Sequence, residues 1–380
     1  MAKKIFYFSL SLFILALILL GAYNFAFKNN KNNPIADPTK KTLEKEAGNA
    51  LVAEETDITN PINESIVGAS VSEDGFLYYY SSDDQAIKKA TLEGRDKTVL
   101  LSNLPGVVTR ALWSAKHDKV LLLIDQTGGG LLWYFSDLRT KSLTPLKGEM
   151  SRLAWDNLGE NIFYQYTDPG TGKRSLNIAN ADGSNWKKVA DLGTEDSFLA
   201  STAQSSLISF WNRPSAKKKS IFETVSTVGE GRRVVFSELF GGDYSWSPNG
   251  ETLLVSGSKD ADGSDFSLYT VSGTGGAAKN LSLPTLISKT AWSKDNRTLY
   301  YALPGALPEN TLLPDDYFGK PLYTKDTFWR ADLTTGKKTR LIDLKESTRA
   351  FDSSDLFLSP NEDALYFTDR ANKRLYRIEL

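Results

Sequence analysis

Short apolar segments alternate with polar turns along most of this chain, and the alternation repeats. In residues 66–380 an apolar segment, a polar turn and a second apolar segment follow one another seven times. Several first segments end in Trp, as in ALWSAKHDKVLLLI (111–124), LAWDNLGENIFYQY (153–166) and YSWSPNGETLLVSG (244–257). A third and a shorter fourth apolar segment complete most repeats. Strands bounded by Ser, Asp, Asn and Gly turns are therefore predicted, and long amphipathic helices are not.

The spacing of the repeats predicts how the strands are grouped. Equivalent positions at the end of the first segment are Val71, Trp113, Trp155, Ala200, Trp246, Trp292 and Leu358. Five intervals lie between 42 and 46 residues, and the last is 66. Four antiparallel strands in a repeat of this length are typical of a β-propeller blade. The prediction is an all-β, seven-bladed β-propeller, with blades starting near residues 66, 107, 150, 196, 241, 287 and 353.

One turn carries a recognisable motif. Trp246-Ser247-Pro248-Asn249-Gly250 resembles the Trp-Ser-Pro-Asp-Gly turn of the TolB-like, WD-repeat-like propellers, and residues 292–295 and 359–361 are partial copies. Ser and Asn cap such a turn, Pro sets φ, and Gly accepts a positive φ. The resemblance covers residues 66–380 and implies the fold but no activity. In this register Trp113, Trp155, Trp246 and Trp292 are expected to pack blades together, with sugar stacking as the alternative.

The N-terminus predicts a membrane anchor. Ile5–Phe27 contains no charged residue, is long enough to cross a bilayer as a helix, and has aromatic residues at both ends. The alternative is a cleaved signal peptide, since Lys3 and Lys4 precede the apolar run. We assign residues 1–27 to a transmembrane anchor, polar residues 28–49 to a tether and 50–380 to the propeller. Lys3 and Lys4 favour a cytoplasmic N-terminus, which places the body outside the cytoplasm.

The last repeat contains only three strands. A propeller must join its first and last blades, because open sheet edges invite pairing with other chains. Residues 50–58 (ALVAEETDI) are therefore predicted to supply the outer strand of the seventh blade.

Antiparallel geometry places the loops on two faces. Loops between second and third strands, together with the connections between blades, emerge on one face, called here the insertion face. Turns between first and second strands and between third and fourth strands emerge on the opposite, turn face. The long interval before the seventh repeat is an insertion, 303–326, with four prolines that argue against a helix or central strand. It is either a lid or partner-binding loop, or a segment that packs on the blade edge.

Composition removes many kinds of chemistry. The chain has 45 Lys and Arg against 46 Asp and Glu, no Cys and one His, His117. It therefore lacks disulfides, thiolate sites and a general affinity for nucleic acid. No phosphate loop is present, so no cofactor is predicted. His117 is expected to be an exposed turn residue. Asp260–Asp265 resembles a calcium loop but lacks its glycine and closing glutamate positions, so no metal site is predicted.

Two functions remain after these exclusions. The main prediction is a single-pass, membrane-tethered propeller, periplasmic or extracellular, that binds an envelope protein or a glycan ligand. Its candidate binding residues on the insertion face are Trp211, Leu312, Leu313, Asp315, Asp316, Tyr317, Phe318 and Trp329. The alternative is a glycan- or lactone-processing enzyme that uses carboxylates at the channel mouth. Those carboxylates would be Asp83, Asp84, Asp125, Asp168, Asp315 and Asp316.

Overall fold

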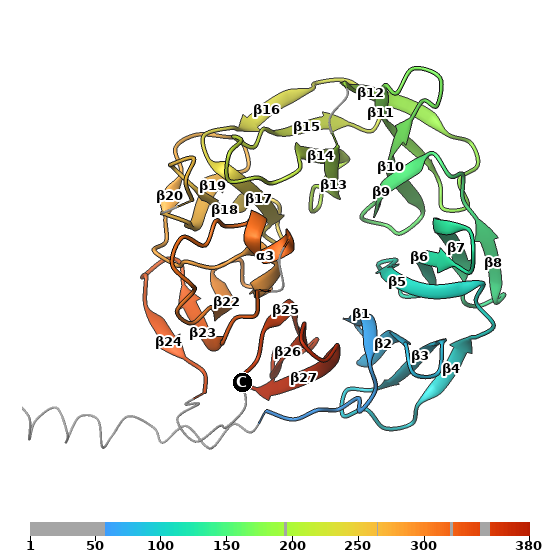
Figure 1. The fold of residues 1–380 in the computed structure, drawn as a ribbon, viewed down its shortest axis with the longest axis horizontal. Helices are drawn as coiled ribbons and strands as arrows, with labels where there is room; N and C mark the ends of the chain where they lie inside the picture. Colours follow the sequence, from blue (N-terminus) through green and yellow to red (C-terminus); the bar gives the residue numbers. More distant parts are fainter. Residues whose placement is uncertain (1–57, 194–195, 264, 320–321, 343–349) are drawn as a thin grey trace, which may run out of the picture. The chain divides into compact units, whose positions relative to one another are not determined.

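Seven antiparallel sheets surround a common axis in the computed structural model (Figure 1). The structure describes residues 58–193, 196–263, 265–319, 322–342 and 350–380, all within one compact unit. The predicted all-β, seven-bladed propeller is confirmed. The predicted anchor, the tether and most of the closing strand lie outside the described residues. Within the described part, no helix combines the length and apolar character needed to cross a membrane.

Blades 1 to 4 each contain four strands in chain order. Blade 1 contains β1 (Ile66–Val71), β2 (Phe76–Ser81), β3 (Ala86–Thr91) and β4 (Thr98–Leu101). Blade 2 contains β5 (Gly106–Trp113), β6 (Lys119–Gln126), β7 (Gly130–Asp137) and β8 (Ser142–Pro145). Blade 3 contains β9 (Met150–Trp155), β10 (Asn161–Thr167), β11 (Arg174–Asn180) and β12 (Lys187–Gly193). Blade 4 contains β13 (Ser197–Ser201), β14 (Leu207–Asn212), β15 (Phe222–Ser226) and β16 (Arg233–Phe236).

Blades 5 to 7 include the two short helices of the described chain. Blade 5 contains β17 (Phe240–Trp246), β18 (Thr252–Ser258), β19 (Ser267–Ser272) and β20 (Lys279–Asn280). Blade 6 contains η2 (Ile287–Lys289), β21 (Thr290–Trp292), β22 (Thr298–Leu303), α3 (Asp315–Gly319), β23 (Thr327–Asp332) and β24 (Lys338–Arg340). Blade 7 contains β25 (Ser353–Leu358), β26 (Ala364–Asp369) and β27 (Arg374–Glu379). In each blade whose first strand is labelled in Figure 1, that strand lies nearest the axis.

The hydrophobic core is divided among the spaces between neighbouring blades. Tyr80 and Ile87 of blade 1 pack with Val120 and Leu122 of blade 2 in one cluster. Another cluster joins Leu77 of blade 1 to Tyr366 and Leu375 of blade 7. Each sheet thus buries both of its faces against other sheets, which explains why its second strand is a nearly continuous apolar run.

Three of the four Trp residues that end first strands are hydrogen-bonded to the blade before them, whereas the Trp292 Nε1–H has no partner in the described protein and its ring only packs against blade 5. The Trp113 Nε1–H donates to the Gly68 carbonyl at 2.6 Å, and Trp155 Nε1–H donates to the Leu112 carbonyl at 2.8 Å. Trp246 Nε1–H donates to Ser209 Oγ at 2.9 Å. These bonds explain why Trp recurs at this position: its indole N–H links neighbouring blades.

The turn after Trp246 shows why the motif has its particular residues. Ser247 Oγ donates to Asn249 Oδ1 at 2.7 Å and accepts from the Thr252 N–H at 3.0 Å. Gly250 has φ +72°, and a Cβ there would lie 2.4 Å from the Ala203 carbonyl oxygen of blade 4. Glycine therefore serves both the turn conformation and the close approach of the two blades.

The ring closes through the residue that follows the predicted closing strand. The Thr59 N–H donates to the Arg377 carbonyl and the Arg377 N–H donates to the Thr59 carbonyl, both at 2.9 Å. Thr59 thereby pairs antiparallel with β27, on the outer side of the three-stranded blade 7. Ile62 is fully buried nearby, and the Ile66 N–H donates to the Lys373 carbonyl at 2.7 Å.

We expect removal of residues 28–60 to destabilise the whole ring, because it exposes the edge of β27 and the core beneath it. The measurement is the melting temperature of the truncated chain against the full chain. Removal of residues 28–49 alone, which keeps the closing segment, is the control. Equal melting temperatures for all three chains would show that this closure is not needed.

Candidate functional site

The insertion 303–326 is held on the insertion face by contacts with blades 4, 5 and 7. The Ala216 N–H of blade 4 donates to Asp315 Oδ2 at 2.5 Å. Leu313 and Tyr317 are buried with Phe266 and Leu286, which belong to blade 5 and the connection after it. From blade 7, the Arg370 Nη2–H donates to the Tyr317 carbonyl at 3.0 Å.

The insertion contains a short helix, which corrects the expectation that its prolines exclude helical structure. α3 follows Pro314 directly and has Asp315 and Asp316 in its first turn. Pro at the start of a helix and acidic residues in the first turn both favour this conformation. Three of the four prolines precede α3 in the chain and the fourth follows it, so none interrupts this single helical turn.

A buried lysine joins the insertion to blades 6 and 7. Lys289 is fully buried, and its Nζ lies 2.6 Å from Asp326 Oδ2 and 2.9 Å from Asp352 Oδ1. The same ammonium donates to Thr324 Oγ1 at 3.0 Å and to the Ser353 carbonyl at 2.7 Å. Four acceptors thus surround one buried cation, as a charge removed from water requires.

Tyr317 and Arg370 extend this cluster towards the surface. Asp352 Oδ2 accepts from Arg370 Nη1 at 2.9 Å, while Tyr317 OH donates to Asp352 Oδ1 at 3.1 Å. The Arg370 guanidinium lies 3.9 Å from the centre of the Tyr317 ring. Burial, and then the charge of Asp352, raises the pKa of Tyr317, so the phenol remains protonated. This arrangement is structural: every charged group has a partner within the cluster.

The predicted binding residues divide into buried and exposed ones. Leu313 and Tyr317 are buried, and Trp211 is buried with its Nε1–H bonded to Asp243 Oδ1 at 3.0 Å. Leu312, Asp315, Asp316 and Trp329 are partly buried, whereas Phe318 is 55% exposed. Leu313 and Tyr317 hold the insertion in place, whereas Trp211 packs within blades 4 and 5. Phe318 is the member of the set with the most surface to offer a partner.

The carboxylates that the enzyme alternative requires do not converge. Asp83 Oδ2 accepts from the Ser65 N–H, Asp84 pairs with Lys88, and Asp125 is exposed. Asp168 Oδ1 accepts from its own turn at Gly170 and Thr171, while Asp316 Oδ2 accepts from Leu312 N–H. Among the described residues, no three His, Cys, Asp or Glu side chains are grouped so that they could hold a metal ion.

Charges of both signs line the innermost strands. Arg152 Nε donates to Asp196 Oδ1 at 3.0 Å. Burial raises the pKa of Asp196, but its bond to Arg152 and the Arg152 charge outweigh this effect and hold the pKa below its ordinary value. Burial, followed by the charge of Arg152, lowers the pKa of Arg110, whereas Asp355 acts in the opposite direction. The axis therefore presents mixed charge rather than a carboxylate pair.

Asp243 is the carboxylate whose protonation the fold alters most clearly on this face. Burial raises its pKa to about 6, although the Tyr244 N–H and the Trp211 Nε1–H both donate to its Oδ1. A carboxyl with a raised folded-state pKa favours the folded state below its unfolded pKa, and this contribution is lost as the pH rises through about 6.

On the turn face, His117 is buried, which corrects the expectation that it is an exposed residue. Its side chain is only 8% exposed, and its Nε2 lies 2.9 Å from Ser70 Oγ of blade 1. The ring packs against Tyr78 and Trp113, with ring centres 5.0 and 6.0 Å away. Burial lowers the pKa of His117, so the imidazole is neutral at physiological pH. The sequence placed it correctly in a turn, but the turn is covered by the neighbouring blade.

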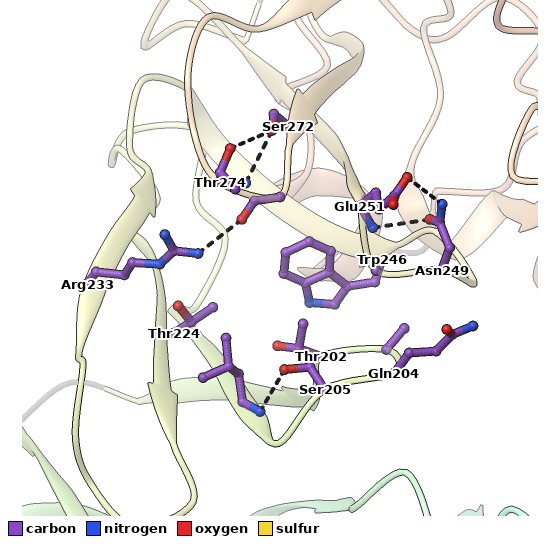
Figure 2. Close-up of a pocket in the computed structure, with 14 residues that line it drawn as sticks. Thr202, Gln204, Ser205, Thr224, Arg233, Trp246, Asn249, Glu251, Ser272 and Thr274 are labelled. Carbon is purple, nitrogen blue, oxygen red and sulfur yellow. Dashed lines mark hydrogen bonds between the residues drawn. The ribbon is translucent and has the colours of Figure 1, made fainter.

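A cavity of about 410 Å³ lies between blades 4 and 5 on the turn face, and both apolar and polar groups line it (Figure 2). One wall comes from the first turn of blade 4 and from Thr224 and Arg233 on its outer strands. The other comes from Trp246, the following turn and the end of β19. The lining also includes the hydroxyl or amide side chains Thr202, Gln204, Ser205, Asn249, Ser272 and Thr274. The sequence analysis did not predict this cavity, although it named Trp246.

Comparisons with solved structures agree on the fold. An oligogalacturonate lyase in complex with manganese matches with TM-score 0.62 at 12% identity, over 86% of this chain and 94% of that one. The Cps50 (Swd1) β-propeller domain of Myceliophteria thermophila matches with TM-score 0.56 at 10% identity, over 85% and 100%. TolB from Acinetobacter baumannii is also matched, with TM-score 0.48 at 12% identity, over 74% and 64%. No family model and no curated protein matches the chain.

These likenesses establish a propeller and nothing about activity, because identities near 12% accompany unrelated functions on one fold. The manganese belongs to the lyase structure. In the present chain the sole histidine is buried between blades 1 and 2, away from any cluster of acidic side chains that could serve as metal ligands in the described region.

Lys289→Met should lower the free energy of unfolding by about 3–5 kcal/mol, since it leaves Asp326 buried without a cation and Asp352 with Arg370 as its remaining one. The measurement is urea unfolding followed by intrinsic fluorescence. Lys294→Met is the matched control, because Lys294 is exposed in the same blade and its ammonium donates to the Pro360 carbonyl rather than to a buried carboxylate. Similar losses of unfolding free energy in both variants would contradict a stabilising role for the charges around Lys289.

Asp243→Asn should stabilise the protein at about pH 8 by about 1–3 kcal/mol and lose this advantage near pH 4. The amide oxygen keeps the two hydrogen bonds of Asp243 but carries no buried charge. Unfolding free energies of the variant and the unchanged protein across this range provide the measurement. Asp168→Asn is the control, since hydrogen bonds from Thr171 lower the Asp168 pKa and its neutralisation gains nothing. A constant difference between Asp243→Asn and the unchanged protein at all pH values would refute the assignment.

Proposed function

We propose that this protein is a membrane-tethered binding or scaffolding propeller of the cell envelope, and that its insertion face engages an envelope protein. Residues 5–27 hold it in the bilayer, and the propeller lies outside the cytoplasm. The support for the tether is in the sequence: an uncharged apolar run long enough to span, preceded by Lys3 and Lys4.

The observation that supports the binding role is that the insertion has a fixed backbone and exposed aromatic side chains. Bonds to Asp315 and to the Tyr317 carbonyl fix its backbone on blades 4 and 7. It nevertheless presents Phe318 and Tyr323 to solvent, 55% and 59% exposed. Aromatic side chains held out by a rigid loop lose little entropy when they bind, and they are typical anchors of protein interfaces.

The enzyme alternative has weaker support. Asp83, Asp168 and Asp316, three of the carboxylates it would use, are engaged by nearby backbone N–H groups. General acid–base hydrolysis needs two carboxyl groups that face one bond of the substrate. A mixed-charge axis with aromatic residues beside it favours recognition over hydrolysis.

The binding face is tested by changing Phe318 and Tyr323 together to Ser in the full-length chain. We expect at least about tenfold less partner to be cross-linked in intact membranes, since two interface anchors are lost. The control changes Trp186 and Val228 to Ser. These two side chains are 54% and 75% exposed and lie in turns of the opposite face. Equal cross-linking in the two double variants would refute the proposed face.

The same full-length chain tests the tether. Protease added outside intact cells or spheroplasts should digest the propeller, and deletion of residues 5–27 should release it from the membrane fraction. Full protection of the propeller from external protease would place it in the cytoplasm and would refute the proposed orientation.

A further inference from the structure

We propose that the cavity between blades 4 and 5 binds a neutral saccharide of one or two rings. This cavity lies on the turn face, so the inference does not depend on the proposed partner of the insertion face. Its volume of about 410 Å³ falls in the range of small-molecule sites.

Trp246 supplies a fixed apolar surface in the cavity. Its indole is partly exposed there, with the N–H held by Ser209 Oγ at 2.9 Å. The Phe222 ring contacts it edge-on with 5.7 Å between ring centres. Gly273 borders the ring so closely that a Cβ would lie 2.9 Å from it. The ring is thus immobilised before any ligand arrives, which reduces the entropy cost of stacking a sugar's C–H face on it.

Thr224 carries an unsatisfied hydroxyl in the cavity wall. Its side chain is 1% exposed, and its Oγ1 has no hydrogen-bond partner within the described protein. A buried hydroxyl without a partner costs free energy, and protein structures rarely retain one without reason. Figure 2 shows Thr224 beside Arg233, across the cavity from the turn of Asn249. Because this Oγ1 has almost no accessible surface, a rotation about the side chain's first torsion would bring the hydroxyl to a ligand seated there.

The charged groups of the cavity favour a neutral ligand. Arg233 and Glu251 are the two charged residues of its lining, so the formal charges cancel. Arg233 Nη2 donates to the Gly273 carbonyl at a long 3.4 Å, and Glu251 Oε2 accepts from Asn249 Nδ2 at 2.9 Å. A donor fork on one side and a carboxylate on the other suit vicinal hydroxyls, which both accept and donate.

The test uses the full-length chain in detergent and a panel of neutral methyl glycosides at millimolar concentration. Saturation-transfer NMR detects binding, and Trp fluorescence titration measures the affinity. We expect Thr224→Val and Arg233→Ala each to weaken the binding about tenfold, equivalent to about 1.4 kcal/mol for one lost hydrogen bond. Thr224→Val should keep or raise the melting temperature, because it removes an unsatisfied buried group.

Two control variants separate the cavity from general effects. Ser136→Ala removes another buried, unpartnered hydroxyl, in blade 2 and outside the cavity. Arg232→Ala removes the neighbouring guanidinium, which pairs with Glu223 at 2.8 Å. Both should bind as the unchanged protein does. The proposal is overturned if no methyl glycoside binds, if binding survives both cavity variants, or if an anionic uronate binds better than its neutral counterpart.

Discussion

Closure of the ring is the constraint on which the rest of this structure depends. Each sheet buries both faces against its neighbours, so no blade is complete until the last one meets the first. Two hydrogen bonds between Thr59 and Arg377 complete this circle, and Tyr366 of blade 7 bonds the Leu92 carbonyl of blade 1. Residues separated by almost the whole chain therefore stabilise one another. Such a frame holds loops on both faces in fixed positions.

The two faces use this rigidity in different ways. On the insertion face, one buried ammonium at Lys289 is surrounded by acceptors from the insertion and blade 7. An ion cluster of this kind contributes little net stability compared with apolar packing, but it specifies one geometry because any displacement leaves a buried charge unpaired. On the turn face, Thr224 of blade 4 and Trp246 of blade 5 line one cavity. The ion cluster around Lys289 positions the exposed aromatic residues of the insertion, and the cavity between blades 4 and 5 offers room for a small molecule.

The number of blades and their boundaries were predictable because they are local properties of the chain. Apolar segments of strand length, a Trp at a regular interval and turns built from Ser, Asn and Gly all act within one repeat. The closing strand at 50–58 stays a prediction, because only its last residue is described; Thr59, the residue that follows it, pairs with β27. The helix α3 was missed because one helical turn between two prolines carries no period that sequence analysis can detect.

By itself, then, the sequence determined the architecture, the equivalence of the repeated turns, and the place of each loop on one face or the other. Only the tertiary structure decided which side chains are buried and which partners they have. His117 reads as a surface residue within its own turn and becomes buried only when blade 1 packs against it. Thr224 and Trp246 belong to different blades, and nothing in either repeat indicates that they share a cavity. The physical reason is that hydrophobic periodicity encodes contacts along a sheet, whereas burial and charge compensation arise between sheets, where residues distant in the chain meet.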